Sequence, residues 1–150
     1  MRALTVKQPW AWAIAAGYKN IENRTTNWSY RGSLAIHAGR HDSRRGWASP
    51  LVQAAQRAST PEVAKRADIR GAIIGVAEVT DIHPVPEPAQ EACCQPWGER
   101  IYLHHGVAKL GLVHVVLSDA HLITPIECRG AQGLWTPAPH ILQQLTDQLS

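Results

Sequence analysis

The amino-acid sequence predicts an α+β protein, built as a mixed and mostly antiparallel β-barrel with helices in the connections. Short alternating or β-branched stretches recur along the chain, and helix-forming segments interrupt them without the regular alternation of a parallel α/β fold. The chain has 150 residues and is 45% hydrophobic, which is enough apolar material for the core of one domain. We therefore expect a single domain over residues 1–150.

The N-terminal part of the chain predicts three strands and one short helix. Ala3–Lys7 has the alternation and β-branching of a first strand. A proline opens the helix expected over Trp10–Ala16, and Gly17 suits its end. Further strands are expected over residues 20–24 and 32–38.

The rest of the chain predicts helices first and then strands. Residues 39–50 are polar and glycine-punctuated, which indicates a loop. Residues 50–67 are alanine-rich and predict a helix that is broken near residues 59–61. Residues 71–82 form the clearest strand, and the proline-rich stretch 84–96 predicts a surface excursion. The remaining expected elements are strands over 101–103, 112–117 and 121–126, a short return over 132–135 and a closing helix over 139–149.

The cysteines and the apolar pattern predict a cytoplasmic protein. Cys93, Cys94 and Cys128 are an odd number with two adjacent, which is poor material for a disulfide framework. The longest uncharged apolar stretch, residues 9–18, is far shorter than the roughly 20 residues of a membrane span. No signal-peptide pattern follows Arg2. We therefore expect no membrane partner.

The spacing of cysteine and histidine predicts no metal site. Cys93 and Cys94 are adjacent, and His104 and His105 follow further along the chain. Neither pair has a usual spacing of zinc ligands. We therefore expect no metal ion and no other cofactor.

Positive charge is concentrated in the N-terminal half. Residues 1–70 contain 12 Lys and Arg against 4 Asp and Glu, a balance of +8, whereas residues 71–150 have a balance of −5. A basic half indicates an anionic partner, with nucleic acid as the first candidate. The alternative is that the two halves interdigitate in the fold and neutralise each other.

Five short motifs follow one another along the chain. They are LTVKQPWA at residues 4–11, GYKNIENR at 17–24, YRGSLAIHA at 30–38, GAIIG at 71–75 and GAQGLW at 130–135. In this order and approximate spacing they resemble the pattern of the ASCH (activating signal cointegrator homology) domain family. The resemblance implies a PUA-like fold, which is a small pseudo-barrel with helices in its connections.

The resemblance also implies a role with nucleic acid. PUA-like proteins commonly bind RNA or read modified bases, and ASCH domains are regarded as nucleic-acid-binding modules. Some small bacterial members hydrolyse an amide on acetylated cytidine, and ribonuclease activity is reported in the family. We therefore expect a nucleic-acid-binding module, with RNA favoured over DNA. The alternatives are a hydrolase acting on a modified nucleoside or RNA, and a protein-interaction adaptor of transcription or translation complexes.

Three charged residues of the second motif form the centre of the candidate site. In an extended segment Glu22 and Arg24 point to the same face, and Lys19 lies at the turn before them. One acid between two bases can hold the cations toward a phosphate or a base edge. In an enzyme, Lys19 would be the general base and Glu22 would orient water. The alternative is an ion pair that only rims the barrel.

The resemblance to the acetylcytidine-hydrolysing relatives is incomplete. Their catalytic set resembles a Lys, a Thr three residues later and a Glu further on. Lys19 matches the first position, but the third residue after it is Glu22. Glu78 is a candidate for the distal position. The departure argues against that particular activity.

The first motif adds two candidate binding residues. Gln8, at the beginning of the expected helix, can hydrogen-bond a base or a phosphate. Trp10 is expected in the core. Trp12 is then the better candidate for stacking on a base, because the two side chains cannot both face the core squarely.

Arginines and one histidine around residues 32–38 complete the candidate site. Interleaved with aromatic residues, the arginines are typical of a groove that follows phosphates and stacks bases. For any one of them alone, a position on a solvated face is the better explanation. His37 either points into the site or is a hydrogen-bonded histidine of the barrel. The arginines are Arg31, Arg40, Arg44 and Arg45.

Overall fold

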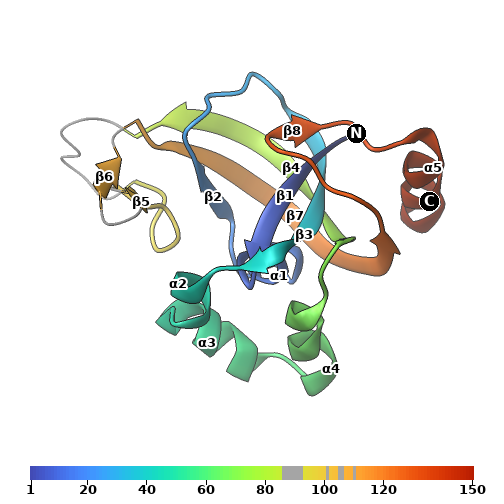
Figure 1. Ribbon diagram of the computed structural model, residues 1–150, viewed down its shortest axis with the longest axis horizontal. Helices are drawn as coiled ribbons and strands as arrows, with labels where there is room; N and C mark the ends of the chain where they lie inside the picture. Colours follow the sequence, from blue (N-terminus) through green and yellow to red (C-terminus); the bar gives the residue numbers. More distant parts are fainter. Residues whose placement is uncertain (86–92, 101, 105–106, 110) are drawn as a thin grey trace.

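A curled six-stranded sheet forms the centre of the molecule (Figure 1). The computed structural model describes residues 1–85, 93–100, 102–104, 107–109 and 111–150. In order of pairing, the strands are β2 (Ile21–Arg24), β7 (Val113–Glu127), β4 (Ala72–Pro84), β3 (Gly32–Asp42), β1 (Arg2–Gln8) and β8 (Leu134–Trp135). All neighbouring pairs are antiparallel except β1 and β3, which are parallel. The expected α+β class is confirmed, as a half-barrel with β2 and β8 at its edges.

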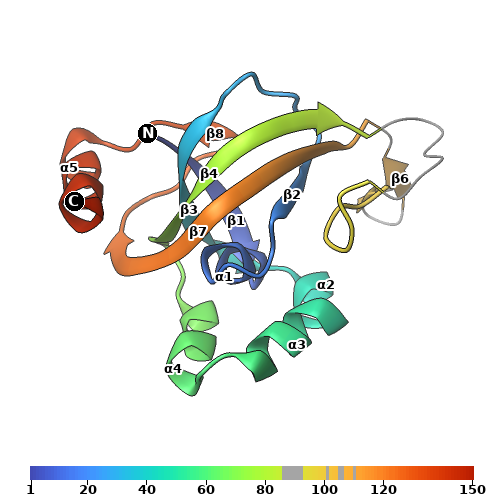
Figure 2. The same ribbon diagram turned by 180° about the vertical axis from the view of Figure 1, so that it is seen from behind.

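Helices occupy the connections, and Figures 1 and 2 show several of them grouped at one end of the sheet. The helices in the connections are α1 (Trp10–Ala15), α2 (Arg44–Trp47), α3 (Pro50–Ala58), α4 (Pro61–Ala64) and the 3-10 helix η1 (Lys65–Asp68). A further helix, α5 (Pro139–Leu149), follows the last strand and lies apart from them (Figure 1). Two short strands form a separate pair beside the main sheet, β5 (Tyr102–His104) and β6 (Val107–Lys109). The break that the sequence predicts near residues 59–61 separates α3 from α4.

Helix α1 packs against one face of the sheet and forms the main core with it. Trp12 and Ile14 of this helix are fully buried against side chains of β1, β3, β4 and β7. The approach is very close at Gly75 of β4, where an added Cβ would lie 2.4 Å from the Cβ of Ala15. A glycine is therefore required at this crossing, because any side chain would push the helix off the strand.

Helix α5 packs against the opposite face of the sheet at one end of the molecule (Figures 1 and 2). Ile73 of β4 and Ile123 of β7 contact this helix through a second apolar cluster. The helix contributes Ile141 and Leu145, which are buried, while most of its other side chains are exposed. The sheet thus has helices packed against both faces, and α5 covers only part of the second face.

The expected loop over residues 39–50 is wrong over most of its length, because a strand and then a helix occupy it. Strand β3 continues to Asp42, which pairs with Gln8 of β1 after an irregularity in the register. Helix α2 then begins, and the Oγ of Ser43 caps it by accepting a hydrogen bond from the backbone N–H of Gly46 at 3.0 Å. The polar, basic sequence resembles a loop because this end of β3 is exposed to solvent.

Residues 112–117 and 121–126 belong mainly to one strand, β7, rather than to two separate strands. The polar residues between them resemble a turn, but the strand bends there without ending. Asp119 adopts a positive φ of 49°, and the pairing of β7 with β4 shifts register close by. Such irregularities increase the twist of a strand and let it follow a curled sheet, as Figure 2 shows for β4 and β7.

Parts of two sequence predictions fall outside the described residues. The surface excursion expected over residues 84–96 includes residues 86–92, and the strand expected over 101–103 begins at Ile101. Both are beyond the part of the chain that the structure describes.

The end of α1 leads directly into the candidate site. Gly17 adopts a positive φ of 87°, so the backbone turns sharply after the helix. The N–H groups of Tyr18 and Lys19 both donate to the carbonyl of Ala13, at 3.0 and 2.8 Å. This helix end fixes Lys19 just before the first residues of β2.

Candidate nucleic-acid interface

Lys19, Glu22 and Arg24 form one connected ion cluster. The Nζ of Lys19 lies 2.9 Å from Oε1 of Glu22, and the Nη2 of Arg24 lies 2.9 Å from Oε2 of the same carboxylate. Lys19 and Glu22 are buried, whereas Arg24 keeps part of its side chain exposed. The carboxylate therefore holds two cations in fixed positions, as the spacing predicts.

The electrostatics of Glu22 follow from these contacts. Burial on its own would raise the pKa of Glu22, because a charged carboxylate loses its hydration. The charges of Lys19 and Arg24 and their hydrogen bonds outweigh burial, so the pKa of Glu22 is lower than its ordinary value. The carboxylate is ionised at neutral pH and anchors the cluster.

Arg24 also connects the two sides of the half-barrel. Its Nη2 donates to the carbonyl oxygen of Thr5 on β1 at 2.9 Å, although β2 and β1 are not paired in the sheet. The guanidinium thus closes the gap between the edge strand β2 and β1. This contact alone gives Arg24 a structural role, whether or not it also binds a ligand.

The cluster lies at the wall of a cavity of about 950 Å³. Five basic side chains line this cavity against two acidic ones, Glu22 and Glu99, so its lining is positive overall. This volume is within the usual range for a small-molecule site. The basic side chains are Lys7, Lys19, Arg24, Arg40 and Arg45.

Three tryptophans line the same cavity. Trp10 packs edge-on against Trp97, with ring centroids 6.4 Å apart, and Trp28 lies elsewhere in the wall. The ammonium of Lys19 lies 5.5 Å from the centroid of the Trp10 ring. The Nε1 of Trp10 donates to the Oγ of Ser43 at 3.0 Å, which fixes the ring. A cation and aromatic faces therefore border the same space.

The expected roles of Gln8 and Trp12 are wrong. Gln8 is fully buried, and its side chain accepts from the backbone N–H of Trp12 and donates to the carbonyl of Ile69. Trp12 is also fully buried, and its Nε1 donates to the carbonyl of Val63 at 2.8 Å. The helix turns its second tryptophan into the core and its first, Trp10, toward the cavity, which reverses the sequence interpretation.

The four candidate arginines do not act as one cluster. Arg40 and Arg45 line the cavity, and the Nη2 of Arg45 lies 2.8 Å from the Oε1 of Glu99. Arg44 is exposed and is not part of the lining. Arg31 instead reaches Asp81 at 3.3 Å on an exposed part of the sheet.

His37 is a histidine of the barrel and does not line the cavity. It is 2% exposed, and its Nε2 hydrogen-bonds the carbonyl oxygen of Cys128 at 2.9 Å. Burial lowers the pKa of His37, although the bond to Cys128 opposes this effect. The Nδ1 is buried without a partner among the described residues.

Residues 96–99 supply a part of the cavity wall that the sequence pattern does not predict. Asn23 holds this segment, because its side chain donates to the carbonyl of Trp97 at 3.1 Å and accepts from the N–H of Glu99 at 2.8 Å. Asn23 lies between Glu22 and Arg24 in the chain, so its closeness to the predicted ion cluster was the one available signal. Trp97 and Glu99 lie outside the five motifs and carry no such signal.

Four potential metal ligands meet outside this cavity. They are His83, Cys93, Cys94 and His114. Spacing along the sequence did not indicate this group, because its members come from two strands and the segment between them.

Among the helices that the structure describes, none combines the length and the apolar character that a membrane crossing requires.

The fold and the site together define a PUA-like half-barrel with a positively lined cavity beside the gap between β2 and β1. The chain belongs to the ASCH domain family, whose pattern it matches over residues 4–110. Members of this family are associated with RNA binding or hydrolysis. The resemblance found in the sequence motifs is thereby confirmed.

Solved structures of similar fold include the ASCH protein of Zymomonas mobilis. That structure has a TM-score of 0.58 and 15% sequence identity, over 97% of this chain and 93% of that chain. A mutant of the same protein gives a TM-score of 0.57 and 16% identity, over 97% and 96% of the two chains. At this identity the likeness concerns the fold. No curated protein matches the sequence significantly.

Proposed function

We propose that this protein is an RNA-binding module that receives a nucleotide of a single strand in the cavity beside Lys19, Glu22 and Arg24. The observation that carries the proposal is the lining of the cavity, where five basic side chains and three tryptophans surround one space. Proteins that bind single strands combine a positive groove for the backbone with aromatic faces for the bases.

The residues that line the cavity have different positions in it and therefore different proposed roles in binding. Lys19 has three N–H donors, of which two serve Glu22 and the carbonyl of Ile21, so within the described part of the chain one is left for a base edge or a phosphate. Arg40 and Arg45 are exposed at the rim, where they can follow the phosphates. Trp28 is half-buried and offers a surface on which a base can stack.

Binding is favoured over hydrolysis by the contacts of the cluster. A general base needs a lone pair within reach of the substrate. Both oxygens of Glu22 accept charge-assisted hydrogen bonds, and Lys19 is committed to the same carboxylate. Glu22 also occupies the position where the acetylcytidine-hydrolysing relatives carry Thr. The cluster is therefore suited to presenting fixed donors.

The direct test is fluorescence anisotropy with a labelled single-stranded RNA, its DNA counterpart and the RNA duplex at low salt. We expect the single-stranded RNA to bind most tightly. If none of the three oligomers binds, the proposal is overturned.

A parallel assay separates binding from catalysis. Wild type is incubated with acetylated cytidine and with a short RNA, and products are followed by chromatography. We expect no turnover of either compound. Turnover by wild type that is lost in Lys19→Arg would establish the hydrolase instead, because a guanidinium keeps the charge but cannot serve as a base.

A further inference from the structure

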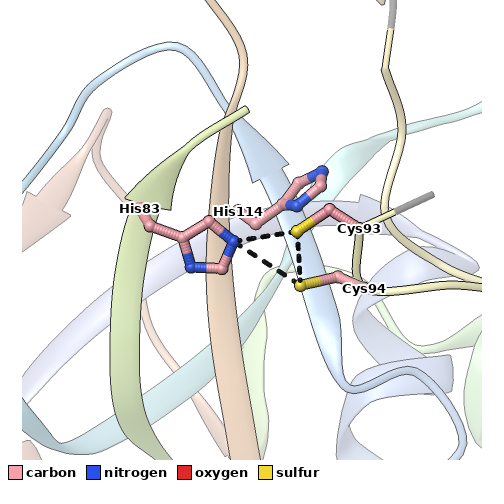
Figure 3. A group of neighbouring side chains, drawn as sticks. All are labelled: His83, Cys93, Cys94 and His114. Atoms are coloured by element: carbon pink, nitrogen blue, oxygen red, sulfur yellow. Dashed lines mark hydrogen bonds between the residues drawn. The ribbon is translucent and has the colours of Figure 1, made fainter. Parts of the chain in front are cut away.

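A group of two histidines and two cysteines lies where β4 ends and β7 begins (Figure 3). His83 and His114 are paired neighbours on these two antiparallel strands. Cys93 and Cys94 come from the segment that follows β4, and both thiols point toward the histidines. The potential ligand atoms of the four residues all lie within 4.8 Å of one another.

The distances are close to those of a tetrahedral zinc site. Zinc bonds of about 2.3 Å to sulfur and about 2.0–2.1 Å to nitrogen place neighbouring ligand atoms about 3.3–3.8 Å apart. The two Sγ atoms of Cys93 and Cys94 are 3.4 Å apart. The Nε2 of His83 lies 3.3 Å from the first sulfur and 3.6 Å from the second. Little movement is needed to place an ion between them.

The backbone at Cys94 brings two adjacent thiols to the same side. Cys94 adopts a positive φ of 61°, which is uncommon for a residue with a side chain. Its carbonyl accepts from the N–H of Gly98 at 2.8 Å, and a Cβ at Gly98 would lie 2.7 Å from the carbonyl oxygen of Cys93. This compact turn is unusual backbone of the kind found at functional sites.

His83 is oriented for ligation through its other nitrogen. The Nδ1 of His83 lies 2.7 Å from Oδ2 of Asp81, so the proton is held on that nitrogen. The Nε2 then presents its lone pair to the two sulfurs. Carboxylates commonly orient metal-binding histidines in this way.

His114 is oriented by the backbone of the cavity wall. Its side chain is fully buried, and its Nε2 donates to the carbonyl oxygen of Glu99 at 2.8 Å. The Nδ1 is buried without a hydrogen-bond partner among the described residues. Figure 3 shows a ring nitrogen of His114 facing Cys93. Buried polar atoms are almost always paired. An unpaired Nδ1 at this position therefore indicates that a partner, such as a metal ion, belongs there.

We propose that His83, Cys93, Cys94 and His114 bind one Zn²⁺ ion as a structural site. Thiolate and imidazole ligands favour Zn²⁺ over Mg²⁺ or Ca²⁺, which prefer oxygen. Binding replaces the two thiol protons, which pass to solvent, and leaves a neutral complex of the ion with two thiolates and two neutral imidazoles. Four protein ligands leave no open position for a substrate.

The ion holds the cavity wall in place. The site ties Cys93 and Cys94 to the ends of β4 and β7, a few residues before Trp97 and Glu99. Glu99 is also bonded to His114 through its carbonyl. The zinc site thus determines where this wall lies, independently of what the cavity binds.

Metal analysis of the wild-type protein tests the site directly. Protein produced in zinc-supplemented medium, and purified under reducing conditions without chelator, is examined by mass spectrometry of its metals. We expect about one zinc per chain. Titration of the chelated and reduced protein with Co²⁺ should give the visible bands of a tetrahedral thiolate complex.

Variants assign the ligands. Cys93→Ser and Cys94→Ser should lose stoichiometric zinc and the thiolate-to-cobalt band, whereas the matched control Cys128→Ser should keep both, because Cys128 lies outside the group. Asp81→Asn should weaken the affinity for zinc by about 10- to 100-fold without loss of a ligand. Circular dichroism records whether each variant folds. If a variant fails to fold, the Co²⁺ titration of the wild-type protein still tests the site.

Wild-type protein with no zinc and no cobalt bands, and with accessible thiols or a Cys93–Cys94 disulfide, would overturn the proposal. Zinc that persists in both cysteine variants, or that Cys128→Ser loses, would also overturn it. Zinc binding is measured without RNA. A negative result here would therefore refute the zinc site and leave the proposed RNA binding to its own test.

Discussion

The ion cluster depends on Glu22, because its carboxylate pairs with both cations. It pairs with Lys19 and Arg24 at 2.9 Å each, and the first of these cations is buried. Removing the charge between two cations leaves them facing each other in a poorly hydrated space. The same fixed geometry is what makes the cluster a suitable set of donors.

Glu22→Gln should lower the free energy of unfolding by about 3 kcal/mol, the lower end for breaking a buried ion pair, because Arg24 stays partly exposed. Chemical denaturation measures the change. Asp42→Asn serves as the control, because it breaks the exposed pair with Arg70 and should cost less than about 1 kcal/mol. Equal effects of the two substitutions would contradict a central role for Glu22.

Arg44 and Arg45 are neighbours in the chain with different positions in the molecule, so they form a matched pair. Arg45→Ala should weaken RNA binding by roughly three- to tenfold and reduce its salt dependence, whereas Arg44→Ala should change the affinity less than twofold. Anisotropy titrations measure both. Each change should alter stability by at most about 0.5 kcal/mol. A larger effect from Arg44 would move the binding surface away from the cavity.

At the scale of elements, the crossing of α1 over β4 is the tightest contact that the structure describes for any glycine. A Cβ at Gly75 would meet the Cβ of Ala15 at 2.4 Å and the carbonyl oxygen of His121 at 2.8 Å. Neither backbone nor a methyl group can move aside cheaply. The helix that carries Trp10 and leads to Lys19 is positioned by this contact.

Gly75→Ala should therefore lower the free energy of unfolding by about 2–3 kcal/mol through overpacking. Gly71→Ala is the control, because Gly71 has open space around it and only its φ of 68° is unfavourable to a side chain. That control should cost about 1–2 kcal/mol. Thermal and urea denaturation compare the two, and a smaller loss for Gly75→Ala would show that α1 can shift away from the strand.

At the scale of the whole molecule, the basic N-terminal half supplies the cavity with its positive lining. All five basic residues that line the cavity lie within residues 1–70. The excess of charge is therefore not neutralised at this surface by the acidic C-terminal half. The interdigitation considered from the sequence does occur locally, where Arg45 meets Glu99.

RNA binding should depend strongly on salt for this reason. With about three to five phosphates neutralised, the logarithm of the affinity should fall with the logarithm of salt concentration with a slope of about −2 to −3.5. Anisotropy titrations at several salt concentrations give the slope. An affinity that does not change with salt would contradict binding through the basic lining.

Stability should also depend on pH through His37. Burial lowers the pKa of His37 in the folded state below its ordinary value of 6.5. The unfolded chain therefore takes up a proton first as the pH falls below 6.5, and stability decreases from there toward the lower pKa of the folded state. Above pH 6.5 the contribution is constant. Melting temperatures across this range measure the effect.

His37→Gln should flatten that part of the pH profile, because the amide keeps a donor for Cys128 but does not titrate. An unchanged profile in the variant would assign the pH dependence to other groups.

Local sequence pattern alone was enough to predict the class of fold, most strands and helices, and the ion cluster of Lys19, Glu22 and Arg24. These follow from local pattern, because periodicity, proline and glycine act over a few residues, and alternate positions of a strand share a face. The break before Pro61 and the closing helix over residues 139–149 are of this kind.

The direction in which individual side chains face, and the contacts between residues far apart in the chain, depend on how the elements pack together. Trp12 is in the core and Trp10 is at the cavity because α1 packs on β4, and nothing in the spacing of the two residues indicates it. His83 and His114 are neighbours because β4 and β7 pair in that register. A pairing register is set by packing across the whole sheet, so a group assembled from two strands and a connection leaves no local signal in the sequence.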